Sequence, residues 1–239
     1  SGVTIQGDGD QYTITFVNQD DTNGGTAIGD AIDVQGNNDI TIDNLHLNSS
    51  DVIDGHIATA ITAGTADNLV ITNSKITDFT EESANEGVVD LADGDDPVIN
   101  KTTFDGDTAE NYNAIDVDGP VSGNGIDIDD NTINNASQGI QIDALADSQS
   151  VNISSNTIEL EADDSDEALD IDIGNNNDAQ AVIEDNTITS TVADSGTAYV
   201  LAASGGDSDA TIDISGGSVD NVTTAVDAET NNVRGAYLN

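Results

Sequence analysis

The strongest constraint on the fold is a short pattern that recurs along most of the chain, at intervals of 25 to 31 residues. It is clearest in IDIDDNTI at 126–133, VNISSNTI at 151–158 and AVIEDNTI at 181–188. Its second apolar residue falls at Ile42, Ile71, Ile99, Ile128, Ile153, Ile183 and Ile214. Five residues later each copy has another apolar residue, at Leu47, Ile76, Phe104, Ile133, Ile158, Ile188 and Val219. Internal repeats of this length indicate an array of small structural units.

A second apolar series accompanies this pattern. Its four-residue segments are AIDV (31–34), AITA (60–63), VVDL (88–91), AIDV (114–117), GIQI (139–142), ALDI (168–171), AYVL (198–201) and AVDA (225–228). Alternation with period two is typical of β-strands that turn one face inward. Each repeat therefore predicts a short strand, a variable loop, a second strand, a kink and a third strand.

A repeat of this size cannot bury its apolar face alone, but it can do so when copies stack about 4.8 Å apart. We therefore expect an all-β solenoid of about eight coils, with three short strands in each coil. The chain would form one domain over 1–239, with an N-terminal edge at 1–29, regular repeats at 30–228 and a C-terminal edge at 229–239.

Asparagine recurs at one position of the kink, as Asn131, Asn156 and Asn186. A kink often requires a left-handed backbone conformation, which Asn tolerates. Stacked side-chain amides can also hydrogen-bond from coil to coil as a ladder. We expect this ladder to be partial, because other residues take the position in the remaining repeats: Leu45, Ser74, Thr102 and Gly217.

Over about residues 30–228, these degenerate NNTI-type repeats resemble the pectate-lyase-like right-handed parallel β-helix superfamily. The resemblance implies a right-handed parallel β-helix. It does not select a function, because the superfamily includes polysaccharide lyases, hydrolases, epimerases, phage tailspikes, adhesins and surface proteins.

The formal charge of −44 arises from 47 acidic residues against Lys75, Lys101 and Arg234. Such a chain has too few basic groups to replace phosphate counterions, so we expect no nucleic-acid partner. No run of 18 apolar residues occurs, and we expect no membrane insertion. The acidic surface fits either solubility in concentrated salt or binding of divalent cations. The even spread of charge favours the first, and the composition resembles that of extreme halophiles.

The middle residue of the second series is predicted to point outward, which makes Asp90 and Asp116 stacked neighbours on successive coils. Two carboxylates at about 5 Å repel by roughly 1 kcal/mol in water and by more in a partly dry groove, so one could act as an acid. The alternative is a solvated acidic face, which we favour because carboxylates occur on every predicted face. Lyase chemistry is disfavoured, since related lyases commonly use Arg or Lys bases and only three such residues are present.

Acidic turns offer oxygen ligands for Ca²⁺. GDGD (7–10), DGDD (93–96), DVDG (116–119) and EADDSDE (161–167) are the densest of them. The candidate ligands taken from these turns are Asp93, Asp95, Asp116, Asp118, Asp163 and Asp164. None of the turns fits an EF-hand loop, and the GGxGxD repeat of calcium-loaded β-rolls is missing. We expect no required cofactor, and only weak binding of Ca²⁺ or other cations.

Five N-x-S/T sequons provide glycosylation candidates, at Asn48, Asn100, Asn135, Asn152 and Asn221. A chain rich in Asn, Ser and Thr also produces sequons by chance. The start at Ser1 rather than Met suggests a processed or excised chain. Together these features favour an extracellular or cell-surface location.

These features favour a non-enzymatic structural or adhesive β-helix module adapted to high salt, one form of which is a self-assembling filament subunit. Its partners would be copies of itself added end to end or neighbouring domains of a surface protein. The alternative is a carbohydrate-active enzyme or tailspike-like depolymerase that acts on a surface polysaccharide through Asp90 and Asp116. Sugar-binding grooves usually offer aromatic rings, and the chain has only four Tyr and three Phe.

Overall fold

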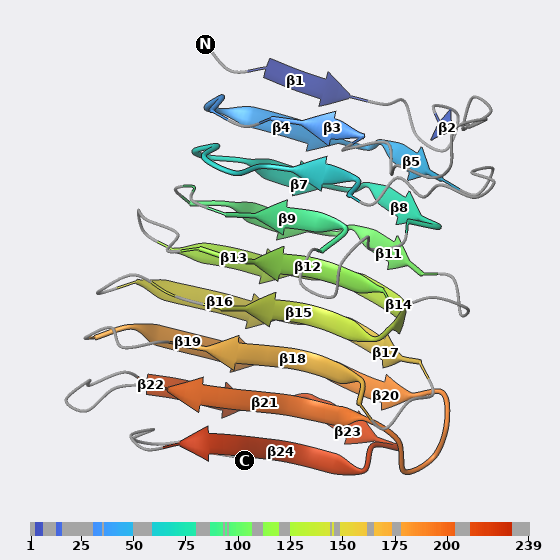
Figure 1. The fold of residues 1–239 in the computed structure, drawn as a ribbon, viewed down its shortest axis with the longest axis vertical. Helices are drawn as coiled ribbons and strands as arrows, with labels where there is room; N and C mark the ends of the chain where they lie inside the picture. Colours follow the sequence, from blue (N-terminus) through green and yellow to red (C-terminus); the bar gives the residue numbers. More distant parts are fainter. Residues whose placement is uncertain are drawn as a thin grey trace, which may run out of the picture.

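The computed structural model describes residues 3–6, 13–15, 31–34, 36–49, 59–79, 87–92, 94, 96–106, 112–119, 125–143, 145, 149–161, 165–173, 178–203 and 211–230. All regular structure within these ranges is β-structure, and it forms three sheets of eight parallel strands each. The strands stack as successive coils of a right-handed parallel β-helix, with β1 at one end and β24 at the other (Figure 1). The predicted fold class is confirmed.

Each coil contributes one strand to each sheet. Sheet 1 consists of β1 (Val3–Gln6), β4 (Ile40–Asp43), β7 (Val70–Thr72), β10 (Val98–Asn100), β13 (Ile126–Asp129), β16 (Ser150–Ser154), β19 (Gln180–Glu184) and β22 (Thr211–Ser215). Sheet 2 consists of β2 (Thr13–Thr15), β5 (His46–Asn48), β8 (Lys75–Thr77), β11 (Thr103–Asp105), β14 (Thr132–Ala136), β17 (Thr157–Leu160), β20 (Thr187–Ser190) and β23 (Ser218–Asp220). Sheet 3 consists of β3 (Ile32–Asp33), β6 (Ile61–Thr62), β9 (Val89–Leu91), β12 (Asn113–Val117), β15 (Gln138–Ile142), β18 (Glu167–Asp172), β21 (Thr197–Ala203) and β24 (Thr224–Thr230).

The register of the sheets places the repeated apolar residues directly over one another. In sheet 1 Ile128 pairs with Ile99 on one side and Ile153 on the other. In sheet 2 Ile133 pairs with Phe104 and Ile158 in the same way. These side chains are fully buried, because alternate residues of these strands point into the narrow interior. The predicted columns are therefore the core of the molecule.

The asparagine ladder lies at the kink between sheets 1 and 2. Asn131 donates from Nδ2 to Oδ1 of Asn156 at 3.0 Å, and Asn156 donates from Nδ2 to Oδ1 of Asn186 at 3.0 Å. Each of the three amides also donates to a backbone carbonyl of sheet 1 in the preceding coil, those of Ile99, Ile128 and Ile153. The ladder thus joins neighbouring coils through side chains, and it also bonds each kink to sheet 1 of the preceding coil.

Other residues continue the ladder in the coils that lack asparagine. The backbone N–H of Thr102 donates to Oδ1 of Asn131 at 3.0 Å. Two coils earlier, the backbone N–H of Leu45 donates to Oγ of Ser74 at 3.2 Å. The hydroxyl of Ser74 therefore takes the acceptor role that an amide oxygen has elsewhere. Between Ser74 and the coil of Thr102 the link is a backbone bond, from the N–H of Thr103 to the carbonyl of Ser74 at 2.9 Å.

We expected the ladder asparagine to have the left-handed backbone conformation of the kink. The structure shows this conformation at the residue before it. Positive φ angles occur at Asp130 (57°), Ser155 (57°) and Asp185 (56°). These side chains are exposed, whereas the ladder asparagines are 1% exposed. The left-handed residue turns the chain at the surface, and the turn directs the next side chain inward to the amide column.

Within the described ranges there is no helical segment that could cross a bilayer.

Candidate functional site

The outward face of sheet 3 carries the candidate catalytic pair, and the structure places Asp90 and Asp116 side by side as predicted. They are register partners in β9 and β12, and Asp116 pairs on its other side with Gln141 of β15. The expectation of an open, solvated face is wrong at the centre of this column, where Asp116 is 0% exposed. Asp90 is half-buried, and only the ends of the column, at Asp33 and Asp227, are exposed.

A close backbone approach contributes to the burial of Asp116. A Cβ built on Gly87 would lie 2.6 Å from the backbone nitrogen of Asp116 and 2.7 Å from its Cβ. The chain at Gly87 can therefore lie against Asp116 only because it has no side chain. The burial of Asp116 thus depends partly on the course of the backbone at Gly87. The alternation of residues along the strand does not predict it.

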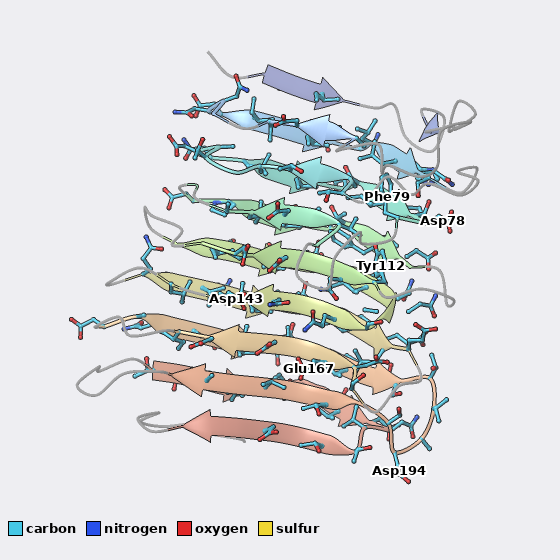
Figure 2. The ribbon with its side chains drawn as sticks, viewed as in Figure 1. Asp78, Phe79, Tyr112, Asp143, Glu167 and Asp194 are labelled. Atoms are coloured by element: carbon cyan, nitrogen blue, oxygen red, sulfur yellow. The ribbon has the colours of Figure 1, made fainter. Side chains whose placement is uncertain are left out.

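Three carboxylates meet where strands β12 and β15 end. The ligand oxygens of Asp116, Asp118 and Asp143 all lie within 4.8 Å of one another. The register explains the meeting, because Val117 pairs with Ile142 and the residue that follows each strand is an aspartate. The backbone N–H of Asp143 donates to the carbonyl of Val117 at 3.0 Å, which keeps the two coils aligned at this point. Figure 2 labels Asp143 in this part of the stack.

The carboxylates of this group differ in their surroundings. Asp116 is buried, whereas Asp118 and Asp143 are exposed. Partial loss of solvent contact raises the pKa of Asp118 above its usual value, and the charge of Asp143 and a side-chain hydrogen bond with it act in the same direction. Like charges so close repel by roughly 1 kcal/mol per pair in water and by more in less polar surroundings. A bound cation would remove this repulsion.

An amide side chain completes the group. Gln141 is 8% exposed, and its Nε2 donates to Oδ1 of Asp143 at 2.9 Å. Its Oε1 is buried and has no hydrogen-bond partner. Buried polar atoms are usually hydrogen-bonded, so this oxygen requires an explanation. Aspartate and amide oxygens together are the ligands that hard cations such as Ca²⁺ prefer.

The sequence predicted only part of this site. Of the proposed ligands, Asp116 and Asp118 belong to the group, while Asp93, Asp95, Asp163 and Asp164 lie outside the described residues. Asp143 and Gln141 were not predicted, because neither lies in a turn where acidic residues are close together along the chain. The signal was present in the repeat: Asp118 and Asp143 each follow directly after a segment of the second apolar series, AIDV and GIQI.

Elsewhere on the surface, carboxylates stack against amides of the next coil. Asn68 donates from Nδ2 to Asp39 at 3.1 Å, and Asn73 donates to Asp43 at 3.0 Å. Asn152 likewise donates to Asp127 at 2.8 Å. Each pair places a neutral donor where a second aspartate would repel. This pairing helps to explain how coils about 4.8 Å apart carry so many acids with so few basic residues.

The structure distinguishes the five sequon asparagines. Asn221 is exposed, whereas Asn48, Asn100, Asn135 and Asn152 are half-buried. Asn152 is bonded to Asp127, and Nδ2 of Asn135 donates to the carbonyl of Gly106. Oδ1 of Asn100 accepts from the hydroxyl of Thr72. Glycosylation stays a prediction, and among the five Asn221 is the most accessible acceptor.

Comparison of the chain with protein-family models, with curated proteins and with solved structures finds no match in any of the three. The parallel β-helix is established by its own register. Membership of the pectate-lyase-like superfamily and a halophile-like character stay predictions.

Proposed function

We propose that this chain is a non-enzymatic structural or adhesive module of an extracellular or cell-surface protein that works in high salt. The observation that carries the proposal is the unbroken stack of three eight-stranded sheets, each with its strands in parallel register. Backbone hydrogen bonds run along the long axis of such a stack, as they do in other solenoids, and they make it a stiff rod. A rod that presents loops and a charged surface suits scaffolding.

The described surface gives little support to a sugar-binding groove. All four described aromatic side chains are buried: Phe79, Phe104 and Tyr112 are 0% exposed, and Tyr199 is 3% exposed. The remaining three, Tyr12, Phe16 and Tyr237, lie outside the described residues. Sugar recognition commonly uses exposed rings for stacking. Burial of Asp116 also argues against its use with Asp90 as an acid–base pair, because substrate must reach such a pair.

End-to-end association is one form of the proposal, and the last described coil is a surface on which it would take place. In its strands Val219 and Val226 are only partly buried, although their register partners Ile188 and Tyr199 are buried. No described strand pairs with the far side of β24. An open strand edge is a template for another chain. Head-to-tail addition would continue all three sheets, and a contact of this type does not close, so it builds a filament.

The proposal is tested by two measurements. Light scattering after size exclusion, in about 1 M NaCl where the Debye length is about 3 Å, should detect assemblies larger than one chain. A strictly monomeric particle under these conditions would eliminate the filament form.

A screen of neutral and acidic polysaccharides should show no turnover by the wild type. The variants Asp90→Asn and Asp116→Ala, checked for folding by circular dichroism, would identify the residues responsible for any activity. Turnover that depends on Asp116 would contradict the non-enzymatic proposal and favour the depolymerase.

A further inference from the structure

We propose that Asp116, Asp118 and Asp143, together with the side-chain amide of Gln141, form a Ca²⁺ site that joins two successive coils. The site would exist whether or not the module assembles end to end, so it does not rest on the proposed function. Its parts are contributed by β12 and β15 and by the residues that directly follow these strands.

The spacing of the carboxylates fits one Ca²⁺ ion. Ca²⁺ binds oxygens at about 2.3–2.6 Å, so two ligands on opposite sides of the ion lie about 4.6–5.2 Å apart. The ligand oxygens of the three aspartates lie within 4.8 Å of one another, inside that limit. Mg²⁺ requires oxygens at about 2.0–2.1 Å in a near-ideal octahedron, and it keeps several waters. A mixed group of carboxylates on two coils suits the more flexible coordination of Ca²⁺.

Gln141 supplies an observation that is independent of the acidic residues. Its amide lies at the group, because Nε2 donates to Oδ1 of Asp143 at 2.9 Å. The oxygen of the same amide is buried without a hydrogen-bond partner, in a side chain that is 8% exposed. A buried amide oxygen without a donor is expensive unless something else satisfies it. In this structure the nitrogen of the amide, and not its oxygen, faces Asp143. Ion binding would therefore require the amide to rotate about its last bond, which exchanges the hydrogen bond from Nε2 for coordination by Oε1.

The register gives the site its mechanical consequence. Asp118 and Asp143 are 25 residues apart in the chain, yet they follow paired residues, Val117 and Ile142, of adjacent strands. An ion held by both would link these coils in addition to the backbone hydrogen bonds. It would also replace a repulsion between carboxylates by an attraction to a shared charge.

Calorimetric titration of the protein with CaCl₂ tests the site. The titration is run in about 1 M NaCl, because salt at this concentration screens diffuse binding to the acidic surface. The wild type should bind one ion in a saturable step. Asp118→Asn and Asp143→Asn, both at exposed positions, should each weaken binding at least about tenfold, since each removes a charged ligand. Asp227→Asn is the matched control: it removes one charge from the exposed end of the Asp116 column and should change affinity by less than about twofold.

Gln141→Leu separates a built site from general attraction to negative charge. It leaves the net charge at −44 and preserves the approximate volume of the side chain. We expect binding to weaken about tenfold, with the circular dichroism spectrum unchanged. Three outcomes would overturn the proposal: no saturable step in the wild type, wild-type affinity in Asp118→Asn and Asp143→Asn, or equal weakening in Asp227→Asn. Wild-type affinity in Gln141→Leu would remove the amide from the site.

Discussion

At the scale of single residues, the ladder asparagines are the polar groups on which the stack depends most. Asn156 takes part in four hydrogen bonds through its side chain. It donates to Asn186 and to the carbonyl of Ile128, and its Oδ1 accepts from both the backbone N–H and Nδ2 of Asn131. All of these groups are buried. If the amide were removed, these buried partners would have neither water nor another protein group to bond with.

Asn156→Ala should therefore destabilise the protein strongly. Each buried group left without a partner costs about 1–3 kcal/mol, so we expect a loss of roughly 3–5 kcal/mol in the free energy of unfolding. Urea denaturation at constant salt measures it. Asn152→Ala is the control, because Asn152 is half-buried and its amide donates a single bond to Asp127; it should cost no more than about 1 kcal/mol. Equal effects of the two changes would contradict the importance of the ladder.

Tyr112 differs from the ladder asparagines, because its buried polar atom has no hydrogen bond that would stabilise the fold. Its ring packs against Gly106, where a Cβ would lie 2.6 Å from Cγ of the ring, and Figure 2 labels it on the same side of the stack as Phe79 and Asp78. Its hydroxyl makes no hydrogen bond of normal geometry. Burial raises the pKa of Tyr112 far above its usual range, and the charges of Asp105 and Asp78 add to the effect; the Asp105 backbone lies near enough to oppose it slightly.

Tyr112→Phe should leave stability unchanged or increase it by about 1 kcal/mol at pH 8, because the unsatisfied hydroxyl is removed. The pH dependence has a defined sign. A raised pKa in the folded state contributes stability that is complete below the unfolded pKa of about 10 and is lost as the pH rises further. The variant should therefore lose less stability than the wild type between about pH 8 and 11. Urea denaturation at both pH values checks this, and a loss of more than about 1 kcal/mol at pH 8 would indicate a missed partner.

At the scale of the structural elements, the coil is a set of short strands whose direction is set by the kinks. Ser155 has φ of 57° and an exposed side chain, while the next residue, Asn156, faces the interior. A left-handed conformation costs about 1–2 kcal/mol for most residues and little for glycine. Asn44 and Asn73 hold positive φ angles before the ladder position in two earlier coils.

Ser155→Gly should therefore stabilise the protein by up to about 1 kcal/mol. The matched control is Ser154→Gly, one residue earlier, at the last position of β16, where the chain is still extended and pairs with Glu184 of β19; it should destabilise the protein by about 0.5–1 kcal/mol. Thermal unfolding of the two variants in one buffer measures the difference. The same sign for both changes would contradict the position of the kink.

The sequence predicted the elements well because apolar periodicity is a local signal. The columns through Ile128 and Ile133 could be read from the repeats, and so could the pairing of Asp90 with Asp116. Three features required coordinates. The left-handed residue lies one position earlier than expected, because the outward residue of the kink turns the chain and the inward residue that follows forms the ladder. Asp116 is buried partly by the path at Gly87. Asp143 joins Asp118 only through contact between coils.

At the scale of the whole molecule, the distribution of charge sets the conditions for stability. With a net charge of −44, the carboxylates of the narrow rod repel one another. The amides bonded to some of them relieve only part of this repulsion. Asp129 illustrates the effect. Burial raises its pKa, and the charges of Asp127 and Asp130 raise it further, while Lys101 and a hydrogen bond with Asn100 act against them.

The melting temperature should therefore rise with NaCl concentration at pH 7, as the Debye length falls from about 10 Å at 0.1 M to about 3 Å at 1 M. A raised carboxyl pKa contributes stability that is complete below the unfolded value of about 3.9 and is lost as pH rises through the folded value. At low salt the protein should melt at a higher temperature at about pH 4, near the unfolded carboxyl pKa, than at pH 7, with a smaller difference at about 1 M NaCl. Calorimetry in both buffers tests this, and a melting temperature independent of salt would contradict it.

The in-register stack is the central claim, and disulfide formation measures it most directly. The chain has no cysteine, so an introduced pair is unambiguous. Asp127 and Asn152 are register partners in β13 and β16, at a spacing of about 4.8 Å that allows a disulfide. The double variant Asp127→Cys with Asn152→Cys should cross-link on mild oxidation, as measured by mass spectrometry after digestion. Asp127→Cys with Ser154→Cys, on the same face but displaced by two residues, should not, since the spacing exceeds about 7 Å. Efficient cross-linking of the displaced pair, or none in the aligned pair, would contradict the stack.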